Sequence, residues 1–154
     1  MLISGFDKVT LLNYPGLVAC TIFTKGCNLK CPFCHNSSLI SGNDDTYIDE
    51  DEIFKYLNKR KNIIEGVCIS GGEPLLQKDI KEFIRKIKSL GLKVKLDTNG
   101  TNPDLILSLI NDNLLDYIAM DIKNIKSKYE LTSGAKVKID NILKKSTKIE
   151  QNVL

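Results

Sequence analysis

The sequence predicts an α/β domain built from about four strand–helix units. Apolar segments rich in strand-forming residues alternate along the chain with amphipathic segments of helical period. A motif of Gly, Asp, Asn or Cys residues directly follows each apolar segment. Strands that alternate with helices are typically parallel and joined by right-handed crossovers, and ligands gather at the carboxyl ends of such strands. We therefore expect the four motifs to meet at one edge of a sheet.

The first two units occupy the N-terminal half. Residues 1–16 are expected to form a short extended lead-in that ends in a turn at N-Y-P-G. Residues 17–23 (L-V-A-C-T-I-F) are a continuous apolar run, which indicates a strand buried on both faces. A helix is predicted from its capping residue Asp49 to about residue 61, and a second short strand covers residues 67–70.

The later units follow the same order. Apolar residues recur at the 3.6-residue period over 80–90, which is the clearest helical signal in the chain. Residues 92–96 alternate apolar residues with lysines, which predicts either a strand with buried lysine stems or an edge strand. The remaining elements are predicted at residues 103–110 (helix, capped by Asn102), 115–120 (strand), 124–136 (loop) and 140–151 (weaker helix).

Composition favours an ordinary globular domain. The net charge is +3, the lysines are dispersed over predicted helices and Trp is absent, so we expect no nucleic-acid partner. The N-terminus has no charged leader with an apolar run, and no apolar stretch approaches transmembrane length. These features predict a cytoplasmic protein without a membrane partner. No linker or repeat separates the units, so residues 1–154 are expected to form a single domain, with 1–16 as lead-in and 17–154 as the units.

Three of the five cysteines, Cys27, Cys31 and Cys34, follow the first predicted strand with the spacing C-x3-C-x2-C. Such a cluster indicates metal chemistry in a reducing compartment, whereas Cys20 and Cys68 lie in apolar runs and are expected to be buried. A closed site for one metal ion usually takes four protein ligands. Three thiolates fit a 4Fe-4S cluster with one iron open to an exogenous ligand.

A zinc site is the alternative, formed by the three cysteines and His35. His35 directly follows Cys34, and adjacent residues would have difficulty reaching one ion together. The motifs at the other strand ends bear on this choice.

In this setting the chain resembles the radical S-adenosylmethionine (radical SAM) superfamily. The cysteine spacing with aromatic Phe33 before the last cysteine is similar to its cluster motif, and residues 71–74 (G-G-E-P) resemble its methionine-binding turn. Residues 97–100 (D-T-N-G) and 121–123 (D-I-K) resemble the branch that activates glycyl-radical enzymes. N-Y-P-G together with C-P-F-C-H-N is similar to the anaerobic ribonucleoside-triphosphate reductase activating proteins, to which pyruvate formate-lyase activating enzyme is related. The implied fold is a partial (β/α) barrel.

The resemblance also implies roles for residues. Cys27, Cys31 and Cys34 would hold three irons of the cluster, and SAM would chelate the fourth. The methionine end of SAM would meet Gly71, Gly72 and Glu73, with glycine allowing close approach of backbone carbonyls and Glu73 accepting from the SAM ammonium. The further implied cofactor contacts are Phe33, Cys34, His35 and Asn36 along the adenine and ribose, Lys123 at the SAM carboxylate, Asp97, Thr98 and Asp121 as a monovalent-cation site, and Asn99 and Ile122 within the same motifs.

The implied function is reductive cleavage of SAM and generation of a glycyl radical on a partner enzyme, most simply an anaerobic ribonucleotide reductase, with reduced flavodoxin or ferredoxin as electron donor. The alternatives are another glycyl-radical enzyme such as pyruvate formate-lyase, a small-molecule substrate as in the deazaguanine-forming synthases, or a non-catalytic metal-binding fragment. Asn13 stands where the activase pattern usually has Asp, which bears on partner recognition. The chain stops where a fifth strand–helix unit would begin, so it is expected either to be truncated there or to close the open sheet edge by pairing.

Overall fold

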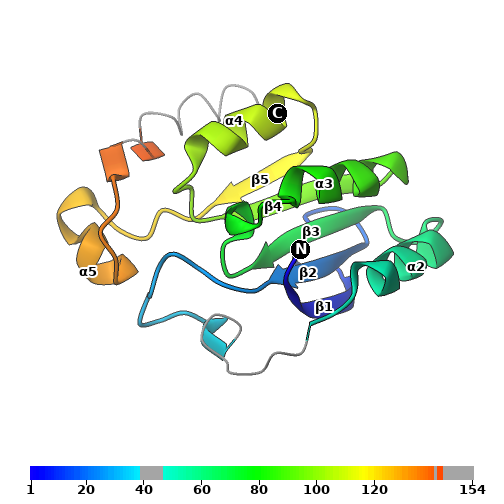
Figure 1. The fold of residues 1–154 in the computed structure, drawn as a ribbon, viewed down its shortest axis with the longest axis horizontal. Coiled ribbons are helices and arrows are strands. Elements are labelled where there is room, and N and C mark those ends of the chain that lie inside the picture. Colours follow the sequence, from blue (N-terminus) through cyan, green and yellow to red (C-terminus); the bar gives the residue numbers. More distant parts are fainter. Residues whose placement is uncertain (39–46, 141, 144–154) are drawn as a thin grey trace.

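The computed structural model describes residues 1–38, 47–140 and 142–143, and its centre is one five-stranded sheet in the order β1-β2-β3-β4-β5 (Figure 1). The strands are β1 (Ile3–Thr10), β2 (Ala19–Thr24), β3 (Gly66–Gly71), β4 (Lys93–Thr98) and β5 (Tyr117–Met120). The last four strands are parallel, as the alternation predicts. The expected α/β fold with an open, partial-barrel sheet is therefore confirmed.

The N-terminal segment, expected to be only a short extended lead-in, contains a full strand, β1, which pairs antiparallel with β2. Phe6 lies opposite Ile22, and the register shifts between Ile3 and Gly5 and between Asp7 and Thr10. These irregularities break the alternation of apolar and polar residues, so the segment gives only a weak strand signal in sequence. The paired β1 covers the β2 edge of the sheet.

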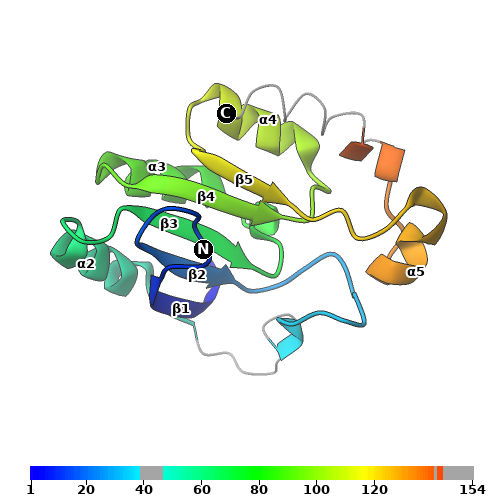
Figure 2. The same ribbon diagram turned by 180° about the vertical axis from the view of Figure 1, so that it is seen from behind.

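Three helices cover one face of the sheet: α2 (Glu50–Arg60), α3 (Ile80–Ser89) and α4 (Pro103–Asn111). In Figure 1 α3 lies in front of β4, and in Figure 2 it lies behind that strand. Asp49 caps α2 by accepting from the Asp51 N–H at 2.9 Å, and Asn102 caps α4 by accepting from the Leu105 N–H at 3.3 Å. No helix of the described residues is long and apolar enough to cross a membrane.

The core lies between these helices and alternate residues of the strands. Ile22, Ile69 and Leu96 are neighbours in register across β2, β3 and β4, and all three are completely buried. The intervening row, on the opposite face, consists of Thr21, Cys68, Lys95 and Tyr117. The sheet is therefore apolar toward the helices and polar toward its other face.

The position of β4 decides between the two strand types predicted for residues 92–96, an edge strand or a strand with buried lysine stems. It pairs with β3 on one side and β5 on the other, so the edge-strand alternative is wrong. Lys93 is exposed, whereas Lys95 is only 7% exposed. The buried-stem alternative therefore holds for Lys95.

The segment predicted as a loop at 124–136 contains a 3-10 turn, η2 (Lys126–Lys128), and a short helix, α5 (Tyr129–Ser133). The loop prediction is wrong there, because five residues are too few to show a helical period. A second 3-10 turn, η1 (Pro74–Leu76), follows β3. Residues 139, 140, 142 and 143 are helical, and the rest of the helix expected at 140–151 lies outside the described residues.

Candidate functional site

A cavity of about 450 Å³ lies at the carboxyl ends of the parallel strands, where the four motifs were expected to meet. Most of the predicted site residues line it: Cys27, Cys31, Phe33, Cys34, His35, Asn36, Gly71, Gly72, Asp97, Thr98, Asn99, Asp121 and Lys123. Glu73 and Ile122 do not line it. The cavity also includes residues that the sequence did not single out, namely Leu29, Ser70, Lys95, Ala119 and Met120.

Glu73 points into the protein, where it is 1% exposed. One carboxylate oxygen accepts from the Thr98 hydroxyl at 2.8 Å and from the Leu75 N–H at 3.1 Å, and the other accepts from the Asn99 N–H at 2.7 Å. Burial raises the pKa of this carboxyl, and the hydrogen bonds from Asn99, Thr98 and Leu75 counteract that rise. Glu73 thus ties the turn after β3 to the end of β4.

Gly71 and Gly72 allow two backbones to touch. A Cβ on Gly72 would stand 1.9 Å from the Gly26 carbonyl oxygen, and one on Gly71 would stand 2.3 Å from the Thr24 nitrogen. The Gly72 N–H donates to the Thr24 carbonyl at 2.9 Å, and the Glu73 N–H donates to the Gly26 carbonyl at 2.8 Å. The missing side chains therefore let this turn dock on the chain that leads into the cysteine loop.

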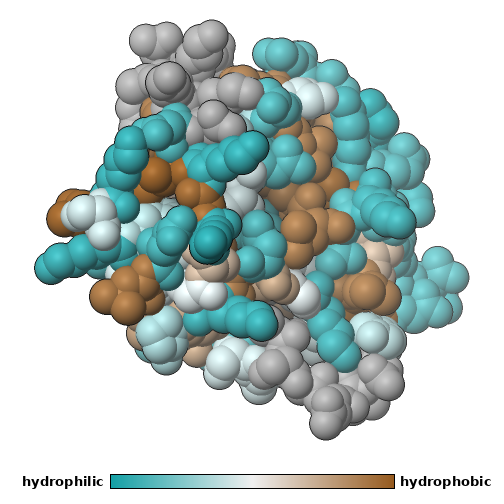
Figure 3. All heavy atoms as spheres, turned by 60° about the vertical axis from the view of Figure 1, so that its left-hand side comes forward, coloured by the Kyte–Doolittle hydropathy of each residue, from teal (hydrophilic) through white to brown (hydrophobic). Residues whose placement is uncertain are grey.

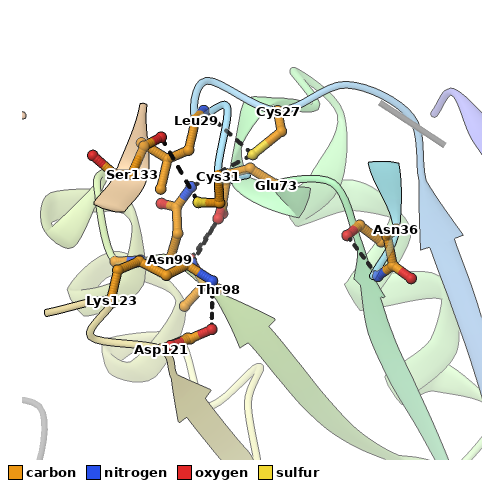
Figure 4. A network of polar contacts seen from close by, with 12 residues as sticks. Cys27, Leu29, Cys31, Asn36, Glu73, Thr98, Asn99, Asp121, Lys123 and Ser133 are labelled. Atoms are coloured by element: carbon orange, nitrogen blue, oxygen red, sulfur yellow. Dashed lines mark hydrogen bonds and ion pairs between the residues drawn. The ribbon is translucent and has the colours of Figure 1, made fainter. Parts of the chain in front are cut away.

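The cysteine loop is held from both sides (Figure 4). Cys27 accepts from the Leu29 N–H at 3.4 Å and lies 3.9 Å from the Asn99 side-chain amide. The Lys30 N–H donates to the Ser133 carbonyl at 2.8 Å, and the Cys31 thiol lies 3.7 Å from the same oxygen. The short helix α5, which the sequence did not reveal, is thus a support of the loop.

The far end of the cysteine loop contacts the glycine turn at the end of β3. The Asn36 side-chain amide donates to the Gly71 carbonyl at 3.2 Å (Figure 4). His35 and Phe33, which precede it, both line the cavity, and Phe33 is 52% exposed. The segment from Phe33 to Asn36 therefore forms one wall of the cavity.

The donor set fits an iron–sulfur cluster. The three thiols line one cavity, while the described residues contain no group of three His, Cys, Asp or Glu side chains arranged for a single metal ion. In a cluster each cysteine binds a different iron, so the thiolates need not converge on one point. Burial raises the pKa of Cys27 and of Cys31, so binding to iron requires these thiols to release protons.

A buried hydroxyl beside the loop is consistent with that fit. Tyr129 of α5 is 1% exposed, and its hydroxyl has no hydrogen-bond partner within the described part of the chain. Burial raises its pKa, and the nearby backbone amide and ammonium of Lys123 counteract that rise. A donor left unpaired beside a cysteine has a natural acceptor in the sulfur atoms of a bound cluster.

Two lysine–aspartate pairs lie in the cavity wall. Lys95 is ion-paired with Asp97 two residues along the same face of β4, and the Cys68 thiol lies 3.3 Å from the other Asp97 oxygen. Lys123 is ion-paired with Asp121. Burial alone would lower the pKa of Lys123, but the Asp121 carboxylate has the opposite effect, and the pKa is raised overall. The sequence feature that could have identified Lys95 as a cavity residue is its position two residues before Asp97, because residues i and i+2 of a strand lie on the same face.

Asn13 lies apart from these residues. Its side-chain amide donates to the buried Thr21 hydroxyl at 2.8 Å, and it does not line the cavity. The residue that departs from the activase pattern is therefore joined to the amino-terminal half of β2.

Comparisons with known proteins agree with this geometry. A sequence model of the radical SAM superfamily matches residues 21–151, so the chain belongs to the radical SAM superfamily. A Methanocaldococcus jannaschii protein named as a glycyl-radical enzyme activating enzyme is 40% identical over 130 residues, covering 84% of this chain and 53% of the relative. The pyruvate formate-lyase-activating enzyme of Listeria monocytogenes is 34% identical over 141 residues, covering 84% and 56%.

Other members of the superfamily are similar as well. A Pyrococcus horikoshii protein named as a GTP 3′,8-cyclase is 30% identical over 131 residues, covering 82% of this chain and 41% of the relative. A solved structure of TYW1 with a lysine–pyruvate adduct bound superposes with a TM-score of 0.55 at 18% identity, over 84% of this chain and 52% of that one, which shows the shared fold. The chain spans about half the length of the curated relatives it matches.

Proposed function

We propose that this chain carries the cluster and SAM site of an activating enzyme for a glycyl-radical enzyme. The observation that carries the proposal is the meeting of the three cysteines and the three other strand-end motifs around one cavity of about 450 Å³. Cys27, Cys31 and Cys34 would hold a 4Fe-4S cluster with one iron open to SAM. When bound and reduced, that cluster supplies the electron that cleaves SAM into methionine and a radical able to abstract hydrogen.

The residues of the cavity would orient SAM. The backbone of Gly71 and the ammonium of Lys123, which both line the cavity, would meet the amino-acid end of SAM. Phe33, His35 and Asn36 would lie along the adenine and ribose. Glu73 would act by holding Thr98 and Asn99 in place, since its carboxylate already accepts hydrogen bonds from both.

The hydrogen donor would be a glycine Cα of a large partner enzyme. Hydrogen-atom transfer breaks that Cα–H bond and forms a C–H bond in 5′-deoxyadenosine, so one electron and one SAM give one glycyl radical. The names of the Methanocaldococcus and Listeria relatives support this class of partner. Within it, N-Y-P-G joined to C-P-F-C-H-N favours an anaerobic ribonucleotide reductase.

The electron donor would be a reduced flavodoxin or ferredoxin that docks beside the cysteine loop. Lys30, Lys128 and Lys136 are exposed around α5, and in the view of Figure 3, which brings this side forward, hydrophilic residues are interspersed with apolar ones. Lysines near the loop would steer a negatively charged carrier toward the cluster.

The test is an anaerobic incubation of the iron-reconstituted protein with reductant, SAM and the ribonucleotide reductase of the same organism. We expect an electron paramagnetic resonance doublet from a glycyl radical, together with one methionine per SAM cleaved. Cys31→Ala should abolish both, and Cys20→Ala, which removes a completely buried thiol that does not line the cavity, should abolish neither.

A small-molecule substrate is the second candidate, favoured by the similarity to the Pyrococcus protein named as a GTP 3′,8-cyclase. It would be supported if SAM were cleaved without any protein radical on a glycyl-radical enzyme. A protein with a complete cluster that does not bind SAM would contradict both candidates.

A further inference from the structure

The floor of the cavity contains a buried ammonium. Lys95 is 7% exposed, lines the cavity and forms an ion pair with Asp97, whose second carboxylate oxygen lies 3.3 Å from the Cys68 thiol. The Lys95 nitrogen also lies 3.8 Å from the Cys68 sulfur and 5.8 Å from the centre of the Tyr117 ring. Both β3 and β5, the neighbours of β4, thus contribute a side chain to this ammonium.

The monovalent-cation site implied by the resemblance does not fit this arrangement. Of its three expected ligands, Asp97 is paired with Lys95 and Asp121 with Lys123. The third, Thr98, directs its hydroxyl toward Glu73 and accepts from the Gly100 N–H at 3.1 Å. Each ligand therefore already has a partner supplied by the chain.

Electrostatics favour the lysine over a dissolved ion. The Lys95 ammonium is buried and therefore requires a charged or hydrogen-bonding partner, and the half-buried Asp97 carboxylate provides it without an entropic cost of capturing an ion. A second cation beside Asp97 would lie close to that ammonium and be repelled by it. Because β4 is a central strand, its backbone is fixed and the Lys95 side chain stays within reach of Asp97.

We infer that Lys95 is a fixed counter-cation of the cavity, so that SAM binds there without a dissociable monovalent cation. The inference rests on the proposed function for the identity of the ligand. Lys95 acts as a positioning residue, because it holds the Asp97 carboxylate and neutralises its charge.

The test measures SAM affinity by anaerobic calorimetry on the cluster-loaded protein in K⁺, Na⁺ or tetramethylammonium at equal ionic strength. Tetramethylammonium is too large to occupy a protein cation site between two carboxylates. We expect wild type to bind SAM equally in all three salts. Lys95→Met should bind about tenfold more weakly in tetramethylammonium, because the Asp97 carboxylate loses its charged partner, and should recover in K⁺.

Three further variants make the outcome independent of folding problems. Lys93→Met changes an exposed lysine of the same strand and should match wild type. Lys95→Arg keeps the charge and should stay independent of the salt. The double variant Lys95→Met with Asp97→Asn leaves no unpaired charge, so it should fold and show no response to K⁺.

Wild-type protein that binds SAM only in K⁺ or Na⁺ would overturn the inference while leaving the proposed function intact. A Lys95→Met variant that binds SAM equally in all salts would also overturn it. Wild-type protein that binds SAM in none of the salts would overturn the proposed function, and the inference with it.

Discussion

Glu73 connects two of the predicted site motifs through hydrogen bonds inside the protein. It accepts hydrogen bonds from Thr98, Leu75 and Asn99, and it is almost completely buried. Replacing it with Ala would leave several buried donors without an acceptor, because water cannot easily replace the carboxylate. We expect Glu73→Ala to lower the free energy of unfolding of the apo protein by about 2–3 kcal/mol.

Urea denaturation of the apo protein, followed by circular dichroism, measures this change. Glu52→Ala, at an exposed carboxylate of α2, serves as the control and should change the free energy of unfolding by less than about 0.5 kcal/mol. Equal stabilities of Glu73→Ala and wild type would show that the three hydrogen bonds do not hold the turn.

The five cysteines differ in the reactivity of their thiols. Burial raises the pKa of both Cys20 and Cys68 to about 12, whereas Cys34 is partly exposed on the loop. The thiolate is the reactive form, so iodoacetamide near pH 8 should label Cys34 well before Cys20 and Cys68. Labelling of the two buried thiols should rise only as the pH approaches 12, where they ionise in the folded state.

Mass spectrometry of the apo protein after timed labelling follows each cysteine separately. Urea-unfolded protein is the control, in which all five thiols should react at similar rates. Fast labelling of Cys68 in the folded protein would contradict its burial between Asp97 and Lys95.

At the scale of elements, the docking of α5 on the cysteine loop is the contact most open to a test. Gly134 ends α5 with φ +64°, and a Cβ there would stand 2.3 Å from the Lys30 carbonyl oxygen. Gly134→Ala should therefore both strain the backbone and push α5 away from Cys31. We expect a loss of stability above about 1 kcal/mol, together with a lower iron content after reconstitution.

Gly16→Ala is a matched control for that variant. Gly16 also has a positive φ, +77°, but a Cβ there meets nothing within 4 Å. It should show the backbone strain alone and bind iron normally. If the two variants incorporate equal amounts of iron, α5 does not support the loop.

The elements that could be predicted from sequence are those with a clear apolar pattern. The helix around Phe83 was predictable because its apolar residues repeat every 3.6 residues, and the four parallel strands because they are apolar runs or, at residues 92–96, an alternating apolar repeat. β1 and α5 were not, because a strand with two register shifts and a five-residue helix offer no such repeat. Their places depend on contacts with β2 and with Lys30, which the local sequence does not encode.

The candidate site likewise has a part that could be predicted from the sequence and a part that could not. Thirteen of its predicted residues line the cavity because the carboxyl ends of parallel strands must meet at one edge. The orientation of Glu73 and the reason for Gly72 could not be predicted, since both follow from side-chain and backbone contacts across elements.

At the scale of the whole molecule, the sheet should be most stable at its centre. β3 and β4 each pair with a parallel strand on both sides, whereas β5 pairs only with β4 among the described residues. Amide hydrogen exchange should therefore be slowest at Val67, Ile69, Val94 and Leu96, which are completely buried, and clearly faster at Ile118.

Exchange followed by mass spectrometry of peptides from the apo protein resolves these strands. An equally protected β5 would indicate that its outer edge is covered in solution, by a second copy of the chain for example. Repeating the measurement over a range of protein concentrations separates that case, because protection by a second copy depends on concentration.

The contact of Gly72 with Gly26 limits how the cysteine loop and the glycine turn can be exchanged between homologous proteins. Two loops far apart in the sequence touch backbone to backbone, so Gly72 cannot accept a side chain unless the Gly26 backbone moves. Gly26 has open space for a Cβ, but its φ of +88° favours glycine. They should therefore be exchanged between scaffolds as a pair. A chimera that takes the cysteine loop from one homologue and the following glycine turn from another would combine two surfaces that were never selected together, and a library that randomises either loop should keep both glycines constant.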